Sequence, residues 1–275
     1  MARPLISSSH TISGVMPGGA TISRHSFEDR VRAATKAGYV GLCLHYRDYL
    51  AQRAAGRSDE NLREILDRHG VVHRSVEFSA DWFVDGVTGE EAQAGLLAAC
   101  RGFAATSFNV GGDLARRGIP FKLMRERFRA LCRRAADQGV AVAMEIVAWG
   151  NVRDIDAVLD LLDGAPDNAG LAIDCWHIFR AGISLQELKR IPADRILCVQ
   201  VNDAAAAPAG PLAEDTMRRK LCGEGDFDLR GFAATLEGMG VIIPFSVEII
   251  SPENAAMGLE ISAQMTFETA RRALG

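Results

Sequence analysis

Long apolar runs and long basic runs are both missing from this chain of 275 residues. No stretch approaches the roughly 18 continuous apolar residues of a membrane span, and the N-terminus turns polar after Leu5 and Ile6 instead of continuing as an export signal. Lys and Arg number 31 against 35 Asp and Glu, for a formal charge of −4. Because nucleic acid attracts basic surfaces, we expect neither a nucleic-acid nor a membrane partner.

Cysteine is sparse, and nucleotide-binding glycine motifs are absent. The six cysteines are scattered with no CxxC pair, which favours reduced thiols and a cytoplasmic location. Cys175, which follows an aspartate, is interpreted as small apolar filling and not as a nucleophile. Neither GxGxxG nor GxxxxGK[ST] occurs at a predicted turn from strand to helix, so no nucleotide cofactor is expected.

The composition is that of a globular protein, with 48% apolar and 24% charged residues. Short β-rich runs alternate with amphipathic helical stretches along the whole chain, which is typical of βα units and a parallel sheet. The eight predicted strands cover residues 5–9, 40–45, 71–78, 104–110, 140–147, 170–175, 196–202 and 242–249. This number favours a closed (β/α)8 barrel over an open doubly wound sheet, as a single domain spanning residues 1–275.

Capping signals predict where several helices begin and end. Possible capping boxes pair Ser26 with Asp29, Thr88 with Glu91 and Ser184 with Glu187, and Pro120 stands at a predicted first helical position. Four glycines just before predicted strands are expected at helix C-termini, namely Gly38, Gly70, Gly139 and Gly240.

Four consecutive predicted strands carry a metal-ligand type of side chain near their ends: Glu145, Asp174, Gln200 and Glu248. In a barrel these C-terminal ends form the active-site face. A carboxylate surrounded by apolar residues is costly to bury, and neighbouring carboxylates repel one another, so a bound divalent cation would relieve both problems. Three carboxylates and an amide oxygen favour Mn or Mg, with Co or Zn as further candidates. The alternative is a set of ion-paired carboxylates in the barrel core.

At these positions the chain resembles the xylose-isomerase-like superfamily of sugar phosphate isomerases and epimerases. The matching segments are Ala-Met-Glu145, Ile-Asp174-Cys-Trp-His177, Val-Gln200-Val-Asn-Asp203, Arg219-Lys-Leu-Cys-Gly223-Glu-Gly225-Asp and Ser-Val-Glu248. The resemblance implies that Glu145, Asp174, Gln200 and Glu248 bind one metal ion. It also implies that His177 touches a substrate oxygen and that Arg219 holds a substrate hydroxyl or carboxylate. Two positions depart from the family pattern, because Gln200 replaces a frequent histidine and Cys222 replaces a proline.

These assignments predict an enzyme that enolises a small polyhydroxylated carbonyl compound, with the metal acting as a Lewis acid on the carbonyl oxygen. Glu145 and Glu248 would act as the acid and base pair, as the resemblance implies. His177 is the third catalytic candidate and would orient or protonate the substrate oxygen. Trp149 could form a wall for the sugar, and Asn109 is a further candidate for substrate binding. The remaining polar residues of the strands are interpreted as loop or core residues held by hydrogen bonds: His10, His45, His73, Arg74 and Glu77.

Several alternatives stay open at this point. An isomerase or epimerase is the favoured function, and a dehydratase or lyase acting on 3-dehydroshikimate, an inosose or a 3-keto-sugar would use the same motifs. A nuclease of the endonuclease IV kind needs more histidines than this chain offers after His177, and a non-catalytic sugar-binding barrel should lack both glutamates. The sequence leaves open whether the substrate is phosphorylated. The resemblance suggests a homodimer or homotetramer.

Overall fold

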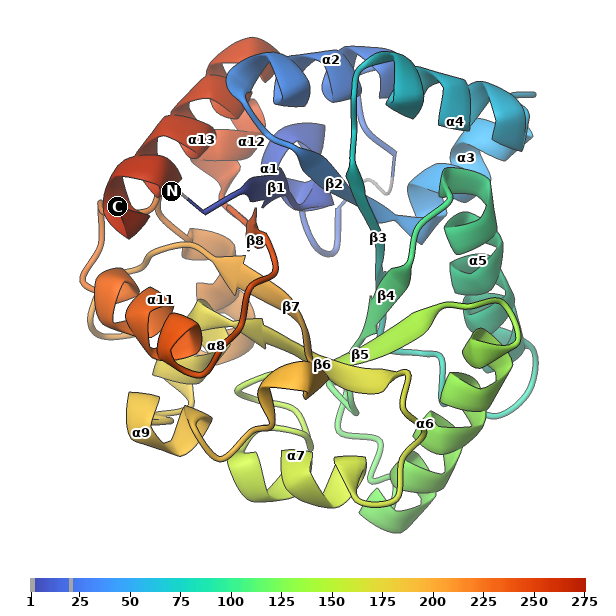
Figure 1. The fold of residues 1–275 in the computed structure, drawn as a ribbon, viewed down its shortest axis with the longest axis vertical. Coiled ribbons are helices and arrows are strands. Elements are labelled where there is room, and N and C mark those ends of the chain that lie inside the picture. Colours follow the sequence, from blue (N-terminus) through green and yellow to red (C-terminus); the bar gives the residue numbers. More distant parts are fainter. Residues whose placement is uncertain (1–2, 20–21) are drawn as a thin grey trace.

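Eight parallel strands close into a barrel in the computed structural model, which describes residues 3–19 and 22–275 (Figure 1). The strands are β1 (Leu5–Ser7), β2 (Gly41–His45), β3 (His73–Ser79), β4 (Ser107–Val110), β5 (Ala141–Glu145), β6 (Ala169–Asp174), β7 (Ile196–Val201) and β8 (Phe245–Val247). Pairing of β1 with β8 closes the ring. The predicted (β/α)8 barrel is confirmed, and the observed strands lie within or close to their predicted ranges. The predicted domain range of 1–275 stays an expectation and includes residues 1–2 and 20–21, which lie outside the described residues.

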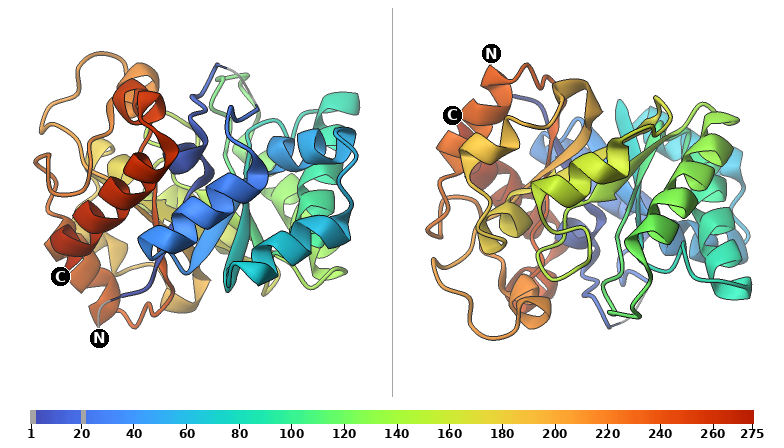
Figure 2. Two further views of the ribbon diagram at one scale, coloured as in Figure 1. Left: turned by 90° about the horizontal axis from the view of Figure 1, so that it is seen from above. Right: turned by 90° about the horizontal axis from the view of Figure 1, so that it is seen from below.

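Helices form an outer ring around the barrel, as the views from above and below also show (Figure 2). The longer ones are α2 (Phe27–Ala37), α3 (Tyr46–Ala54), α4 (Asp59–Arg68), α5 (Val87–Phe103), α6 (Phe121–Ala136), α7 (Ile155–Leu162), α11 (Leu229–Gly238) and α13 (Leu259–Leu274). Shorter ones lie in the connections: α1 (Ser9–Ser13), α8 (Cys175–Arg180), α9 (Leu185–Leu188), α10 (Leu212–Asp215) and α12 (Pro252–Ala256). Within the described ranges, none of the helices combines the length and apolar character needed to cross a membrane.

Most of the predicted caps are found in the structure. Ser26 accepts a hydrogen bond from the Asp29 backbone, and Ser184 and Glu187 form the full reciprocal capping box. The prediction for Thr88 and Glu91 is wrong, because α5 begins at Val87, with Gly86 at the N-cap position and no side-chain cap, so Thr88 lies inside the helix. Pro120 precedes α6 at the N-cap position instead of standing inside the helix. Each of the four predicted C-terminal glycines has a positive φ, which glycine adopts without steric cost.

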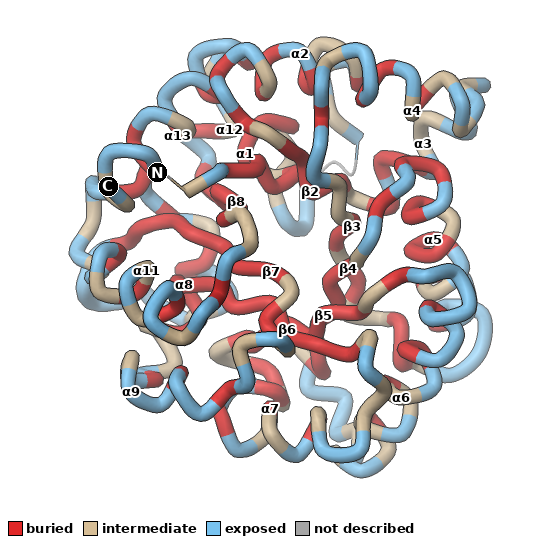
Figure 3. Tube along the Cα trace, viewed as in Figure 1, coloured by how far each residue is buried: buried red, intermediate tan, exposed pale blue. Residues whose placement is uncertain are grey.

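The apolar core lies between the barrel and the helices, so that the strands are buried over most of their length (Figure 3). The inside of the barrel is a separate, smaller cluster formed by Ala143, Ala172 and Cys198. Small side chains there leave room for longer polar ones nearer the carboxyl ends of the strands. His73 and Arg74 had been interpreted as loop or core residues held by hydrogen bonds. His73 is exposed, whereas the largely buried Arg74 donates to Val71 O and Phe103 O and pairs with Asp67.

Gly41 in β2 has no space for a side chain. A Cβ atom at this position would lie 2.3 Å from the His73 carbonyl oxygen of the neighbouring strand. We expect Gly41→Ala to destabilise the protein by about 1–3 kcal/mol, because the strand pair must move apart. Gly238→Ala is the matched control, because its Cβ would meet nothing within 4 Å. Chemical denaturation should show a loss for the first variant and no loss for the second, and equal stability of the two would contradict this packing.

Candidate active site

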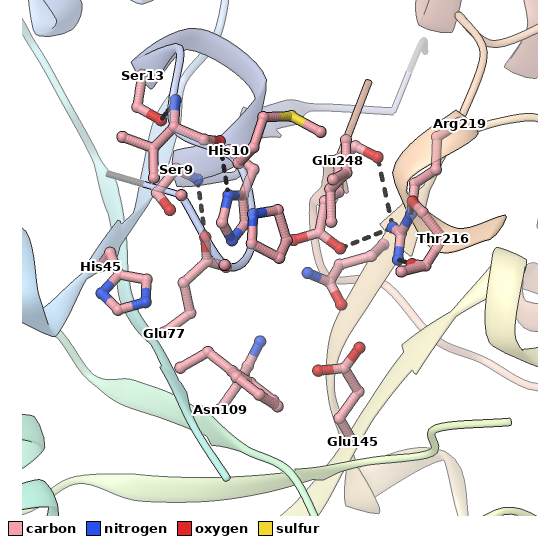
Figure 4. Close-up of a pocket in the computed structure, with 18 of the residues that line it drawn as sticks. Ser9, His10, Ser13, His45, Glu77, Asn109, Glu145, Thr216, Arg219 and Glu248 are labelled. Carbon is pink, nitrogen blue, oxygen red and sulfur yellow. Dashed lines mark hydrogen bonds and ion pairs between the residues drawn. The ribbon is translucent and has the colours of Figure 1, made fainter. Parts of the chain in front are cut away.

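A cavity of about 310 Å³ opens at the carboxyl ends of the strands. Its lining includes Glu145, His177, Gln200, Arg219 and Glu248, together with Asn109 and Trp149. The close-up shows carboxylates from different strands turned toward one another across this space (Figure 4). The structure therefore brings the catalytic and substrate-binding candidates expected from the sequence to one cavity. Asp174, which does not line the cavity, lies directly beneath it through its contact with Arg219.

Register explains why the four expected ligand residues meet. Asp174 of β6 pairs with Gln200 of β7, and Gln200 pairs with Ser246 of β8, two residues before Glu248. Glu145 ends β5, beside β6. Because side chains alternate between the two faces of a strand, residues two apart point the same way and form layers inside the barrel. All four side chains are buried.

Arg219 lies between two of the carboxylates. Its Nη1 donates to Asp174 Oδ2 at 2.6 Å and to Glu248 Oε2 at 2.8 Å, and the guanidinium is buried. Nε and Nη2 bind the backbone oxygen and the hydroxyl of Thr216. The resemblance implied a grip on the substrate, whereas in the structure most of the donors of Arg219 are used by the protein. This residue compensates charge within the site, and at most a small part of its donor capacity faces the cavity.

The surroundings of the three carboxyl groups differ, and so do their pKa values. Burial and the nearby negative charges of Glu248 and Asp174 raise the pKa of Glu145 well above its ordinary value. Burial raises the pKa of Glu248 to about 8, although Arg219 opposes the shift. Burial acts in the same direction on Asp174, but Arg219 and hydrogen bonds from Trp176 N and Asn202 hold the pKa of this group below its ordinary value. Asp174 is therefore the carboxylate that stays ionised most readily.

His177 presents a fixed tautomer. Burial lowers its pKa to about 3, so the ring is neutral near pH 7. Its Nδ1 accepts from the Ala148 backbone N–H at 3.4 Å, which leaves the proton on Nε2, at 3.4 Å from Glu145 Oε1. The Trp149 ring stands edge-on to His177 with centroids 5.2 Å apart and forms part of the cavity wall.

The donor set fits a divalent cation by charge and by chemistry. Five buried carboxyl groups line the cavity or contact residues that line it. Asp48 is paired with Arg30, Asp174 and Glu248 share Arg219, and Glu77 and Glu145 are paired with neither arginine. Gln200 Oε1 is buried without a hydrogen-bond partner among the described residues. The oxygens of Glu145 and Asp174 and a ring nitrogen of His177 lie within 4.8 Å of one another. This compact group includes His177, which had been expected to orient or protonate a substrate oxygen and not to bind metal, and omits Glu248, which is paired with Arg219.

Glu77 is one of the cavity residues that the sequence interpretation missed. It had been interpreted as a loop or core residue, but it lines the cavity. Its Oε1 accepts from Ser9 N at 2.8 Å and from Ser8 Oγ at 3.2 Å, and Ser8 Oγ also lies 2.9 Å from Glu248 Oε1. The signal was available, because a glutamate in an apolar run near the end of a strand is the pattern that selected Glu145 and Glu248.

Two histidines interpreted in the same way, His10 and His45, also line the cavity. His45 caps α3, its Nδ1 accepting from Arg47 N at 3.1 Å. Burial lowers the pKa of His45 to about 3, so the neutral ring carries its proton on Nε2. Its neighbour His10 contacts the Val15 carbonyl oxygen through Nδ1, an arrangement in which Nδ1 is the donor and Nε2 an acceptor.

A family model described as "Xylose isomerase-like TIM barrel" matches residues 31–268 of the chain. The chain belongs to this family. The resemblance expected from the sequence is thereby confirmed, and the family's barrel is the one that the structure describes.

The curated relatives that match part of this chain include a dehydratase and an isomerase. A 3-dehydroshikimate dehydratase of Pseudomonas aeruginosa is 30% identical over 131 residues, which cover 47% of this chain and 21% of the relative. An inosose isomerase of Bacillus licheniformis is 30% identical over 140 residues, covering 50% of this chain and 48% of the relative. The chain thus matches about half or less of the length of these relatives.

Solved structures of the same fold cover the whole chain. The IOLI protein, crystallised with a bound zinc atom, superposes with a TM-score of 0.84 at 18% identity and covers 100% of this chain and 98% of its own. An L-ribulose 3-epimerase gives a TM-score of 0.73 at 17% identity, with 100% and 95% covered. At these identities the likeness establishes the fold alone.

The shifted pKa values of the buried groups predict how the stability of chelator-treated protein changes with pH. A folded pKa of about 8 for Glu248, against an ordinary 4.5, means that the folded chain keeps a proton that the unfolded chain loses, so stability falls as pH rises through this window. Glu145 acts in the same direction. His45 and His177, lowered from 6.5 to about 3, oppose this fall only below pH 6.5.

We therefore expect stability to decrease from pH 6.5 to pH 8, by at most about 1.4 kcal/mol per pH unit for each carboxyl group. Urea denaturation at the two pH values measures this change. Glu248→Gln should make the slope shallower, because it removes one of the two titrating groups. A wild-type protein that is more stable at pH 8 than at pH 6.5 would contradict the assignment.

Proposed function

We propose that this chain is a divalent-metal-dependent isomerase or epimerase that acts on a small polyhydroxylated carbonyl compound. The observation that carries the proposal is the pair of buried carboxyl groups, Glu145 and Glu248, which line one cavity together with His177 and Gln200. Isomerisation and epimerisation both begin with removal of a proton from the carbon next to a carbonyl, and both end with return of a proton. Two carboxyl groups that face the same cavity can serve as the base and the acid of these two steps.

One divalent ion would be held by Glu145, Asp174, Gln200 and Glu248, with His177 within reach of the first two. Two observations support this ligand set. Gln200 Oε1 has no hydrogen-bond partner among the described residues, and the buried carboxyl groups outnumber the single positive charge of Arg219 that is paired with them. The oxygen-rich donors favour Mn or Mg. When bound, such an ion supplies Lewis acidity at the substrate carbonyl oxygen.

Different residues of the cavity would then carry out the proton transfers. Glu145 and Glu248 both line the cavity and would act as the base and acid pair, one removing a carbon-bound proton and the other returning one. The Nε2 proton of His177 is positioned to donate to a substrate oxygen, and Trp149 excludes water along that wall. Arg219 keeps Asp174 ionised by its contact at 2.6 Å.

Dehydration is the second candidate, and the match to a 3-dehydroshikimate dehydratase favours it specifically. The same proton removal would start the reaction, and the intermediate would then expel a β-hydroxyl group instead of being reprotonated. The residues would be shared by both reactions. The two functions are separated by the product formed and not by the first step.

Exchange of a carbon-bound proton tests the function directly. Wild-type protein with added Mn or Mg should incorporate deuterium from D2O into at least one compound of a panel of ketohexoses, inososes and 3-dehydroshikimate, as followed by NMR. Glu145→Gln and Glu248→Gln should each lower kcat by about 10²- to 10⁴-fold while the barrel stays folded. Glu91→Gln, which removes an equal charge from the exposed face of α5, is the matched control.

The product then distinguishes the candidates. An epimer or an aldose-ketose pair would establish the isomerase, and loss of water would establish the dehydratase. Absence of exchange from every compound in the panel would count against both functions. Near-normal activity in either glutamine variant would remove that glutamate from the acid and base pair.

Metal content tests position 200 separately from catalysis. Gln200→His should bind the ion at least as tightly as the wild type, because imidazole is a stronger donor than a neutral amide oxygen. Gln200→Leu, which removes the donor, should weaken binding by about 10- to 100-fold or more. Equilibrium dialysis followed by elemental analysis measures both variants. Loss of metal from the histidine variant, or full retention by the leucine variant, would show that position 200 is not a ligand.

A further inference from the structure

The wall of the cavity that faces Glu145 and Glu248 is built by three side chains from adjacent strands: His45 of β2, Glu77 of β3 and Asn109 of β4 (Figure 4). His45 pairs with Glu77 in the β2–β3 register, and β4 continues the same layer despite a register shift beyond Val76. Glu77 is 2% exposed and Asn109 is 1% exposed, so neither side chain is solvated like a surface residue.

Glu77 uses its two oxygens differently. Oε1 accepts from the Ser9 backbone N–H and from Ser8 Oγ, and so it holds the loop that follows β1. Oε2 is buried, and no donor among residues 3–19 and 22–275 forms a hydrogen bond of normal geometry with this atom. The Cys43 thiol, a weak donor, lies close to the carboxyl group. Leaving a buried carboxylate oxygen without a donor is costly, so this atom is available to a ligand.

The two polar atoms of the Asn109 amide also differ in their contacts. Its Nδ2 lies 3.5 Å from Cys198 Sγ across the barrel interior and donates to that sulfur. Its Oδ1 is buried and meets no hydrogen-bond donor of the described chain. Glu77 Oε2 and Asn109 Oδ1 are therefore two acceptors, on neighbouring strands of one cavity wall, that the protein does not use.

His45 adds a donor beside these acceptors. Its Nδ1 is engaged by Arg47 N, so a neutral ring carries hydrogen on Nε2. A ligand group that meets both Glu77 and His45 must donate to one and accept from the other. A hydroxyl group does both, whereas an ammonium group has no acceptor and a carboxylate has no donor. A second metal ion would find only two oxygen ligands here, fewer than hard cations require.

We propose that Glu77, Asn109 and His45 form a hydroxyl-recognition subsite, which binds two neighbouring hydroxyl groups of the substrate and sets its specificity. The inference rests on the proposed function for the identity of the occupant, a polyhydroxylated carbonyl compound. Substrate hydroxyls donate to Glu77 Oε2 and Asn109 Oδ1, and one of them accepts from His45 Nε2. The subsite thereby turns the carbonyl end of the molecule toward Glu145 and Glu248 on the opposite side.

Glu77→Gln separates recognition from structure. The carboxamide oxygen can still accept from Ser9 N, while the group in place of Oε2 becomes a donor that repels a donating hydroxyl. We expect calorimetric binding of the unreactive cyclitol myo-inositol, with Mg present, to weaken by about 10- to 100-fold. Thermal stability should stay close to that of the wild type. Glu91→Gln, on the exposed face of α5, should change neither property.

Monodeoxy inositols identify the hydroxyl involved. For one of these compounds, we expect loss of the hydroxyl to lower the affinity of the wild type by about 10- to 100-fold. The same loss should lower the affinity of Glu77→Gln by less than about threefold, because this variant already lacks the Glu77 oxygen that accepts from the hydroxyl. A purely structural role for Glu77 would weaken all cyclitols equally and would lower stability. The proposal is overturned if wild type does not bind myo-inositol, if Glu77→Gln binds it normally, or if no deoxy compound shows the coupling.

Failure of this proposal and failure of the proposed function give different results. Binding of cyclitols that depends on Glu77, without deuterium exchange from any carbonyl compound, would leave the subsite in place and refute the enzymatic function. Exchange and turnover that are unaffected by Glu77→Gln would support the function and refute the subsite.

Discussion

The convergence of buried carboxyl groups at one mouth of the barrel is the constraint on which the rest of the site depends. Glu145, Asp174 and Glu248 come from neighbouring strands, and Arg219 Nη1 neutralises part of the charge of the last two. The protein does not remove the remaining charge by ion pairs. Instead, the structure holds it around a cavity, where proton binding or a cation can compensate it. Burial, together with the neighbouring negative charges, raises the pKa values of Glu145 and Glu248.

The barrel architecture allows these side chains to converge without disturbing the apolar core. Small residues such as Ala143, Ala172 and Cys198 fill the interior below the site, so the longer polar side chains at the next layer reach the centre without displacing the apolar core outside. The loops are then fixed by a few buried carboxylates. Asp203, for example, accepts from the backbone N–H groups of Gly223 and Phe227, which holds the turn that follows Arg219.

The fold and the positions on the strands could be predicted from the sequence, because both follow from periodicity. Alternation between strands and helices led to the barrel, and a carboxylate in an apolar run identified Glu145 and Glu248. Partner choice could not be predicted in this way. Arg219 lies 45 residues after Asp174, and its insertion between two carboxylates depends on the path of a long loop. Glu77 has the same local pattern as Glu145, but only the structure reveals that one of its oxygens is used by the backbone and the other is not.

Backbone contacts, more than charge, determine what the cavity offers to a ligand. A backbone N–H engages Nδ1 of both His45 and His177, so each neutral ring keeps its proton on Nε2. The opposite arrangement at His10, where Nδ1 faces a carbonyl oxygen, leaves an acceptor. Donors and acceptors are thus assigned before any ligand arrives, and a molecule with many hydroxyl groups, each able to donate and accept, matches such a mixed lining better than a molecule with one charged group.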